Sequence, residues 1–230
     1  SIGLGAMGFH AYLQRNDIDF ESIYATSFNH KCFKHIKSES RKVSQRLADE
    51  RGEAPDVYGT GYRHSHLLAV APNASSSIIC GGTSPSIEPF RANIFTHKTL
   101  TGNYQVKNRF LEDLFRKKKL SPEKIKDLWA DILEHNGSVQ HLDILSDHEK
   151  NVFKTATEIN QIWVVEHALK RQEFICQSQS VNLFFTLPKA TEDQETHDDY
   201  MQYVNDVHWY GANKLKSLYY FRTEAARTTE

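Results

Sequence analysis

The amino-acid sequence predicts an α/β fold whose strands are mainly parallel. Segments with the spacing of an amphipathic helix alternate along the chain with short apolar segments that are typical of buried strands. No internal repeat and no Pro-, Gly- or Ser-rich linker interrupts this alternation. We therefore expect the 230 residues to form one domain, residues 1–230.

The first half of the chain supplies the less regular elements. Residues 2–13 are small and apolar, and residues 20–51 are predicted to form a long helix that Gly52 ends. Residues 66–71 (HLLAVA) have the pattern of a buried strand, and a second short extended segment is expected from Ile87. The stripe expected to face the core from the long helix consists of Phe20, Ile23, Phe28, Cys32, Ile36, Val43 and Leu47.

The second half carries clear helix signals. Ser121, Pro122 and Glu123 supply a capping hydroxyl, a proline at the first helical position and an acid in the first turn, and we expect this helix to end at Gly137. A capping box at 146–149 predicts a helix that continues to about Leu169. The remaining expected elements are a strand at 181–187, a helix at 194–210 and an extended segment at 215–221.

Composition excludes several classes of protein. The 28 Lys and Arg residues balance 29 Asp and Glu residues, so the net charge of −1 argues against a general nucleic-acid or membrane-surface binder. The mean hydropathy is −0.58, and no apolar run is long enough for a membrane helix. No charged segment is followed by an apolar one in the order typical of a signal peptide. Three widely spaced cysteines form neither a disulfide framework nor a zinc pattern, which favours a reducing cytoplasm.

The loop from Pro72 to Ser77 (PNASSS) lies between an expected strand and a possible short helix at 75–80 that Gly81 and Gly82 would halt. The first N–H groups of a helix lack internal partners, and with Asn73 and the hydroxyls of Ser75, Ser76 and Ser77 they could hold a phosphate. An ordinary N-cap loop explains the same residues, because Asn and Ser are the preferred caps. The residues alone leave both interpretations open.

Tyr219 and Tyr220 lie in the last apolar segment, LKSLYYFR. An aromatic-rich strand explains them, since tyrosine is common in strands. A redox relay also explains them, because a phenol that loses an electron must also shed its proton to a polar neighbour. Adjacent residues of a strand point to opposite faces, so the two rings can stack only where the strand bends or ends.

No metal site is expected. His141, Asp143, Asp147 and His148 resemble a ligand cluster, but two of them lie in the capping box and none forms a known ligand motif. His64 and His66 lack the partners that a hydrolase needs. The basic run at 116–119 is expected to be a solvated helix end.

Long stretches of the sequence resemble the carboxy-terminal part of the large, catalytic subunit of class I ribonucleotide reductases, of the type found in T4-like phages. The stretches are SIGLGAMGFHAYL, then HLLAVAPNASSSIICGGTSPSIEPFRANIFTHKTLTG, then GSVQHLDILSDHEKNVFKTATEINQIWVVEHALKRQEFICQSQSVNLF, and finally LKSLYYFR. The resemblance implies an α/β fold of which this chain supplies the second half of a ten-stranded barrel, with surrounding helices. It also implies thioredoxin- or glutaredoxin-dependent reduction of ribonucleoside diphosphates to 2′-deoxyribonucleoside diphosphates by radical chemistry.

The resemblance assigns roles at two places. Asn73, Ala74, Ser75 and Ser76 match the stretch that cradles the substrate diphosphate, and Tyr219 and Tyr220 match the pair that relays the radical from the small subunit. The implied partners are the N-terminal half of the large subunit, a small subunit with a di-iron tyrosyl radical, and a second large subunit. No cofactor is expected on this chain, and ATP or deoxynucleotide effectors would bind the missing N-terminal region.

The sequence also departs from the family pattern. The thiyl-radical cysteine and the reducing cysteine pair lie upstream of the resembling stretches, and the chain ends at Glu230 without the family's tail cysteines. We therefore expect this chain alone to be inactive, as one fragment of a split enzyme in the host-cell cytoplasm. The alternatives are an inactive remnant that binds a nucleotide or a partner, and an unrelated phosphate-binding α/β enzyme.

Overall fold

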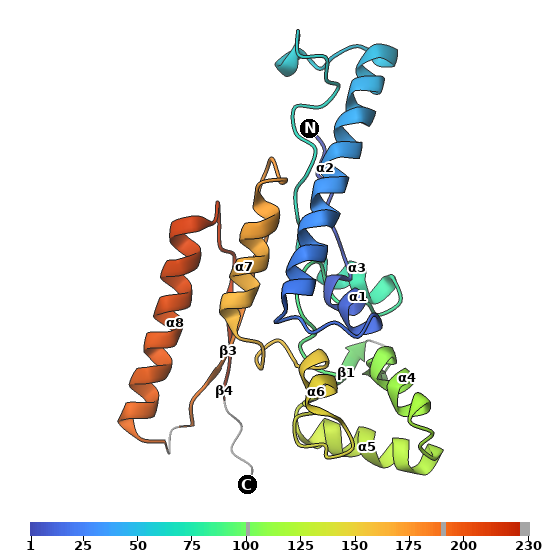
Figure 1. Cartoon of the computed structure of the whole chain (residues 1–230), viewed down its shortest axis with the longest axis vertical. Helices are drawn as coiled ribbons and strands as arrows, with labels where there is room; N and C mark the ends of the chain where they lie inside the picture. Colours follow the sequence, from blue (N-terminus) through green and yellow to red (C-terminus); the bar gives the residue numbers. More distant parts are fainter. Residues whose placement is uncertain (100–101, 190–191, 226–230) are drawn as a thin grey trace. The chain divides into compact units, whose positions relative to one another are not determined.

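The computed structural model describes residues 1–99, 102–189 and 192–225 (Figure 1). The C-terminal end of the chain, which is expected to lack the family's tail cysteines, lies outside these ranges. The chain divides into two compact units. One unit contains residues 1–6, 26–72 and 161–230, and the other contains residues 7–25 and 73–160. The expectation of a single domain over residues 1–230 stays a prediction, and each unit is described by itself.

The first unit is built on four extended segments that pair in parallel. Residues 2–4 bond to 66–69, with Leu4 paired with Leu68, and residues 68–70 bond to 177–180, with Val70 paired with Gln179. β3 (Leu183–Leu187) then pairs in parallel with β4 (Phe221–Ala225), in the register Leu183 opposite Phe221. The prediction of mainly parallel strands is therefore confirmed in this unit, although 66–71 forms isolated bridges rather than a regular strand.

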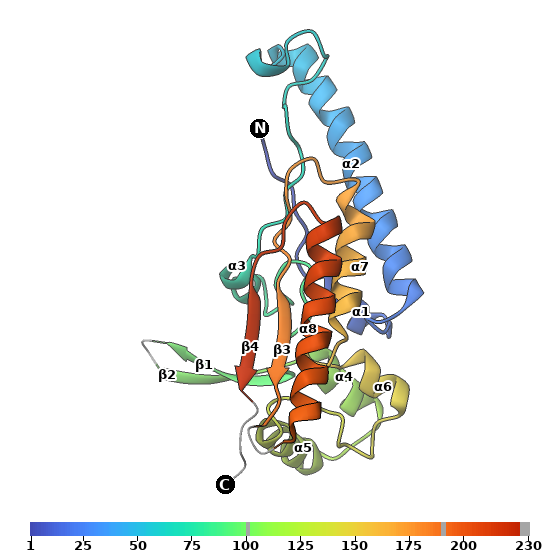
Figure 2. The same cartoon turned by 90° about the vertical axis from the view of Figure 1, so that its left-hand side faces the viewer.

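Helices accompany this parallel array. α7 (Gln161–Gln172) and α8 (Gln194–Lys214) lie side by side next to β3 and β4, as the two views show (Figures 1 and 2). α2 (Ile23–Arg51) carries most of its length in the same unit, followed by the short 3-10 turn η1 (Pro55–Val57). Asn29 of α2 donates to the His167 carbonyl of α7 at 2.7 Å.

The buried face of α2 differs from the predicted stripe. Ile23 and Val43, which were expected in the core, are 73% and 41% exposed. The face that is buried instead consists of Ala25, Asn29, Phe33, Ser40, Ser44 and Ala48. Small and hydroxyl-bearing residues form most of it, and the Ser44 hydroxyl accepts from the His64 N–H at 3.1 Å. A hydrophobic pattern alone could not identify a face of this composition.

Arg171, near the C-terminal end of α7, is fully buried in the first unit. Arg171 donates from Nε to Gln179 Oε1 at 2.7 Å and from Nη1 to Asn29 Oδ1 at 3.4 Å. Gln179 in turn donates to the Ala168 carbonyl at 2.9 Å. Burial lowers the pKa of Arg171 to about 9.

The second unit begins with α1 (Phe9–Arg15) and contains α3 (Ala74–Ile79), α4 (Arg109–Lys117), α5 (Pro122–Glu134) and α6 (Asp147–Val152). Its apolar core joins α4, α5, α6 and the segment 139–145. Within it the rings of Phe115 and Trp129 meet edge to face at 5.8 Å between centroids. α4 ends in Arg116 and Lys117, so the predicted basic helix end is confirmed.

Two predictions about the second unit are confirmed in detail. The Ser121 hydroxyl caps α5 by accepting from the Lys124 N–H, and Pro122 is the first helical residue. Ser146 and Glu149 form both bonds of a capping box at the start of α6.

Two other predictions are wrong. The helix from Ser146 does not continue to Leu169, because α6 ends at Val152 and α7 begins only at Gln161. Buried polar bonds hold the break: Asn93 donates to the Phe153 carbonyl at 2.8 Å, and Glu158 accepts from the Thr155 N–H at 2.7 Å. No strand begins at Ile87. The strands nearby are β1 (Ile94–Thr99) and β2 (Gly102–Lys107), an antiparallel hairpin that the sequence analysis missed.

Gly137 follows α5 in a left-handed conformation that strains residues other than glycine. Its φ is +85°, and a Cβ at this position would lie 2.5 Å from the Ala92 Cβ and 3.0 Å from the Ala92 Cα. Gly82 in the same unit also has a positive φ of +66°, but a Cβ there would meet nothing within 4 Å. The two glycines therefore separate backbone strain from steric overlap.

We predict that Gly137→Ala lowers the free energy of unfolding by at least about 3 kcal/mol, because left-handed strain and overlap with Ala92 add together. Gly82→Ala should lose only the strain, about 1 kcal/mol. Urea unfolding of the two variants beside the parent protein measures the difference. Equal losses in the two variants would contradict the role assigned to the contact with Ala92.

Candidate functional site

The predicted phosphate loop lies at the start of α3 in the second unit. Asn73 occupies the N-cap position with φ 50° and ψ 32°, a left-handed conformation, and its side chain makes no capping bond. The first backbone bond of the helix runs from the Ser77 N–H to the Asn73 carbonyl at 3.1 Å. The N–H groups of residues 74–76 therefore have no acceptor within the helix.

The loop has the backbone shape of an anion nest. A left-handed residue followed by right-handed residues turns successive N–H groups toward one concave point, which suits an anion. Ala74, Ser75 and Ser76 are exposed, so the start of α3 is accessible to a ligand. The Ser77 hydroxyl differs, because it is buried and donates to the Ala74 carbonyl at 2.7 Å. Ser77 is thus committed to the helix, and the idea that it adds a donor to the nest is wrong.

The tyrosine pair lies in the first unit, immediately before β4. The Tyr219 N–H donates to the Val181 carbonyl at 3.0 Å, and the Tyr220 carbonyl accepts from the Leu183 N–H at 2.9 Å. The Asn182 side chain also accepts from the Tyr220 N–H at 3.2 Å. Regular strand structure begins only at Phe221, and the two rings approach to 4.1 Å between centroids at 47°. The two rings can therefore meet because they lie just outside the regular strand, as the sequence analysis required.

The phenols are electrostatically linked. A hydrogen bond with Tyr220 raises the pKa of Tyr219 above its ordinary value, and the nearby Tyr220 charge acts in the same direction. The Arg222 guanidinium, 5.5 Å from the Tyr220 ring centroid, opposes this rise. Tyr219 and Tyr220 are 48% and 51% exposed, so both rings are reachable from outside the unit.

A small cavity borders Tyr219. Its volume is about 210 Å³, and its lining consists of Val70, Ser178, Gln179, Ser180, Ser217, Leu218 and Tyr219. The hydroxyls of Ser178 and Ser217 lie 2.5 Å apart. A cavity of this size has room for water, which is a proton acceptor of the kind that a phenol needs.

The three cysteines are free in the structure. Burial raises the pKa of the Cys32 thiol. Burial also acts to raise the pKa of Cys176, yet this pKa lies below its usual value because the Leu68 and Leu67 N–H groups donate to the sulfur at 3.2 and 3.1 Å. That the cysteines have no catalytic role stays a prediction.

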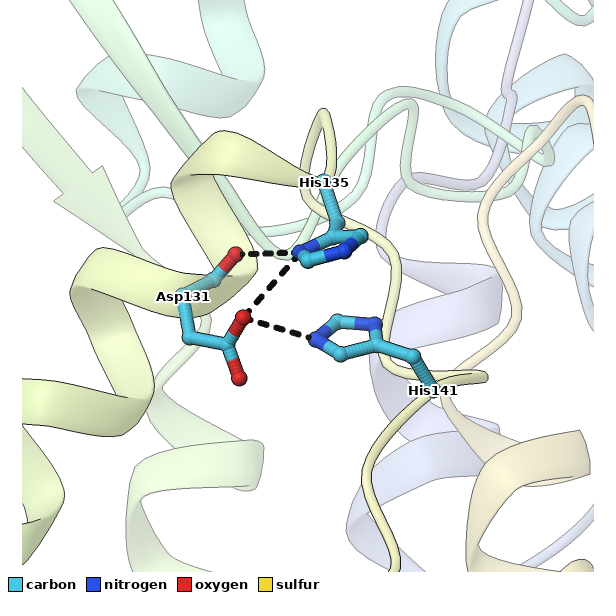
Figure 3. A group of neighbouring side chains, drawn as sticks. All are labelled: Asp131, His135 and His141. Atoms are coloured by element: carbon cyan, nitrogen blue, oxygen red, sulfur yellow. Dashed lines mark hydrogen bonds and ion pairs between the residues drawn. The ribbon is translucent and has the colours of Figure 1, made fainter.

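The structure also brings together three side chains that the sequence analysis did not group: Asp131, His135 and His141 (Figure 3). Among the described residues, no such group contains Asp143, Asp147 or His148, although these resemble a ligand cluster with His141 in the sequence. Asp147 begins α6, and His148 lies 3.2 Å from the Asp17 carboxylate. The signal that could have found the trio is the i, i+4 spacing of Asp131 and His135 on one helix face.

The parallel segments and the helices beside them define an α/β protein. The family model described as "Ribonucleotide reductase, barrel domain" matches residues 1–59 and 54–221. The chain belongs to this ribonucleotide reductase family, and the α/β barrel prediction is thereby confirmed for the part of a barrel that the chain contains.

Similar proteins agree with this assignment. The ribonucleoside-diphosphate reductase large subunit of Invertebrate iridescent virus 3 is 45% identical over 100% of this chain and 35% of its own length. That of Invertebrate iridescent virus 6 is 44% identical over 97% of this chain and 22% of its own length. The solved Actinobacillus ureae class Id ribonucleotide reductase alpha subunit is 39% identical, with a TM-score of 0.78 over 97% of this chain and 39% of its own.

The chain therefore spans between about a fifth and two fifths of the length of these relatives. The viruses among them are not phages, and the T4-like kinship stays a prediction. Within the part of the chain that the structure describes, no helix combines the length and the apolar character that crossing a bilayer requires.

We predict that Tyr220→Phe lowers the pKa of Tyr219 toward its ordinary value, because the phenol that bonds to Tyr219 is gone. NMR titration of protein labelled at the tyrosine ring carbons measures this shift. Tyr58→Phe is the control, since Tyr58 is 87% exposed. A Tyr219 pKa that responds equally to both substitutions would contradict the coupling.

Proposed function

We propose that this chain is the part of a ribonucleoside-diphosphate reductase large subunit that holds the substrate diphosphate and relays the radical. The meeting of two phenols at the start of β4 is the observation that carries the proposal. The match to reductase large subunits over the whole chain supports it. The reaction assigned to the whole enzyme is reduction of a ribonucleoside diphosphate to its 2′-deoxy form, with electrons from thioredoxin or glutaredoxin.

The relay needs only the two phenols and a hydrogen atom. When one phenol has lost its hydrogen atom, the other donates its own: one O–H bond breaks, the other forms, and the radical changes place. The two rings approach to 4.1 Å between centroids, and this proximity supports a direct transfer between them. Radical entry requires the small subunit, whose di-iron tyrosyl radical is the proposed source, so no metal of this chain takes part in the relay.

The phosphate role rests on neutral donors. The free N–H groups of residues 74–76, the hydroxyls of Ser75 and Ser76, and the left-handed turn at Asn73 together suit a diphosphate. Hydrogen bonds to a charged phosphate are about twice as strong as bonds between neutral groups, so several of them hold the anion without a lysine.

The proposed assembly includes further chains. We propose that an N-terminal half of the large subunit supplies the remaining strands and the cysteines, together with the site for ATP or deoxynucleotide effectors. Pairing of two large subunits and a place in the host-cell cytoplasm belong to the same proposal. Ile2 and Leu4 of the first extended segment are exposed, and this apolar surface supports contact with a further chain.

We predict that Ser75→Leu combined with Ser76→Leu raises the KM for ribonucleoside diphosphate by about tenfold or more in the enzyme reassembled with its upstream half and small subunit. Two hydroxyl donors are lost and bulk is added beside the N–H groups. Ser38→Leu, at an exposed position of α2, is the control. An unchanged KM in the double variant would remove the cradle from the proposal.

We predict that Tyr219→Phe and Tyr220→Phe each abolish deoxynucleotide formation in the same reassembled enzyme while leaving substrate binding intact. Phenylalanine keeps the ring but lacks the hydroxyl hydrogen atom that the relay transfers. Turnover and equilibrium binding of the diphosphate are measured together, with Tyr58→Phe as the control. Normal turnover in either variant would disprove the relay.

A further inference from the structure

We propose that Asp131, His135 and His141 form a binding site for a divalent transition metal ion such as Zn²⁺. Among the residues that the structure describes, their ligand atoms converge, and all lie within 4.8 Å of one another. Figure 3 shows the two imidazoles turned toward one carboxylate oxygen. The site lies wholly in the second unit and is independent of the proposed radical relay. It departs from the expectation that this chain holds no metal.

Local structure brings the three side chains together. Asp131 and His135 are one helical turn apart at the C-terminal end of α5, so they share a face. The chain then reverses through Asn136 and Gly137, both with positive φ, and the Gly137 N–H donates to the Ile132 carbonyl at 2.7 Å. Val139 and Leu142 are buried on either side of His141 and fix the returning segment.

The distances suit a tetrahedral metal. Asp131 Oδ1 lies 3.1 Å from His135 Nδ1 and 3.2 Å from His141 Nε2. Ligands at about 2.0–2.1 Å from zinc in a tetrahedral site lie about 3.3–3.4 Å from one another. Both measured separations are therefore close to the edge of a zinc tetrahedron, with the metal ion taking the place of the protons that the imidazoles share with Oδ1.

The chemistry of the ligands selects the class of metal. Two imidazoles and one carboxylate suit zinc, copper, cobalt or nickel better than calcium or magnesium, which prefer oxygen ligands. The carbonyl groups at the end of α5 add the negative end of the helix dipole. The Asp131 carbonyl accepts from the His135 N–H at 3.1 Å and lies 2.9 Å from His135 Nδ1.

The side chains can adjust to a metal ion. The imidazoles stack at 3.7 Å between centroids with 20° between their planes, so each ring must turn to aim its lone pair at a shared ion. His135 and His141 are 51% and 26% exposed, and Asp131 is 42% exposed, which leaves room for such rotation. The partial exposure also gives the ion an entry path and leaves a position for water.

The test is Zn²⁺ binding by the full chain after removal of metals with a chelator. Isothermal titration should detect one more equivalent of Zn²⁺ in the parent protein than in His135→Ala or His141→Ala, with affinity at this site reduced more than tenfold in each. His148→Ala is the matched control, since His148 also contacts a single carboxylate, that of Asp17, at 3.2 Å. Equal stoichiometry and affinity in the parent and the His141→Ala variant would overturn the proposal.

Co²⁺ provides a second readout that does not depend on the alanine variants being well folded. A tetrahedral N,O site gives Co²⁺ an intense visible absorption band, which we expect in the parent protein and in His148→Ala. Asp131→Asn preserves the shape of the side chain and should weaken the band and the affinity more than tenfold. A parent protein whose Co²⁺ spectrum is that of the hydrated ion would overturn the site.

Discussion

The first unit depends on backbone hydrogen bonds between parallel extended segments. Parallel neighbours cannot be joined by a tight turn, so each must be reached by a long crossover, and α2, α7 and α8 are the crossovers. Successive segments come from residues 2–4, 66–70, 177–187 and 219–225. The tyrosine pair lies on the last of these segments, and its ring geometry follows from the point at which regular pairing begins.

The second unit contains a buried polar network beside its apolar core. The Asn108 side chain donates to Gln14 Oε1 and to Asn93 Oδ1, both at 2.8 Å, and its own oxygen caps α4. His10 accepts from the Phe90 N–H at 2.9 Å, and burial lowers the pKa of His10 to about 3. A network in which each member has a partner fixes one arrangement of the chain, because leaving any group unpaired in the interior is costly.

The sequence predicted what local chemistry determines. The caps at Ser121 and Ser146 need only nearby residues, and both form as expected. The break between α6 and α7 could not be predicted, because distant partners such as Asn93 hold it. The same reason applies to the buried face of α2, where Asn29 and Ser44 have partners far away in the sequence.

The sequence also predicted only part of each candidate site. The residues alone did not decide whether Asn73–Ser76 form an ordinary helix cap or a phosphate-binding loop. Only the resemblance to a family favoured the phosphate role. Nothing in the composition of LKSLYYFR distinguishes a relay from a strand. Asp131 and His135 were visible as a helical pair, but their meeting with His141 depends on the reversal at Gly137.

The array of parallel segments has two outer sides, and among the described residues no segment bonds to the far side of residues 2–4 or of β4. The backbone groups along these edges can form hydrogen bonds with a strand of another chain, in the same way as the paired segments bond to one another. A neighbour arriving beside β4 would enclose two rings that are now half in water. Such an assembly would exclude water from the phenols. The dielectric constant around them would then fall without a change in any side chain.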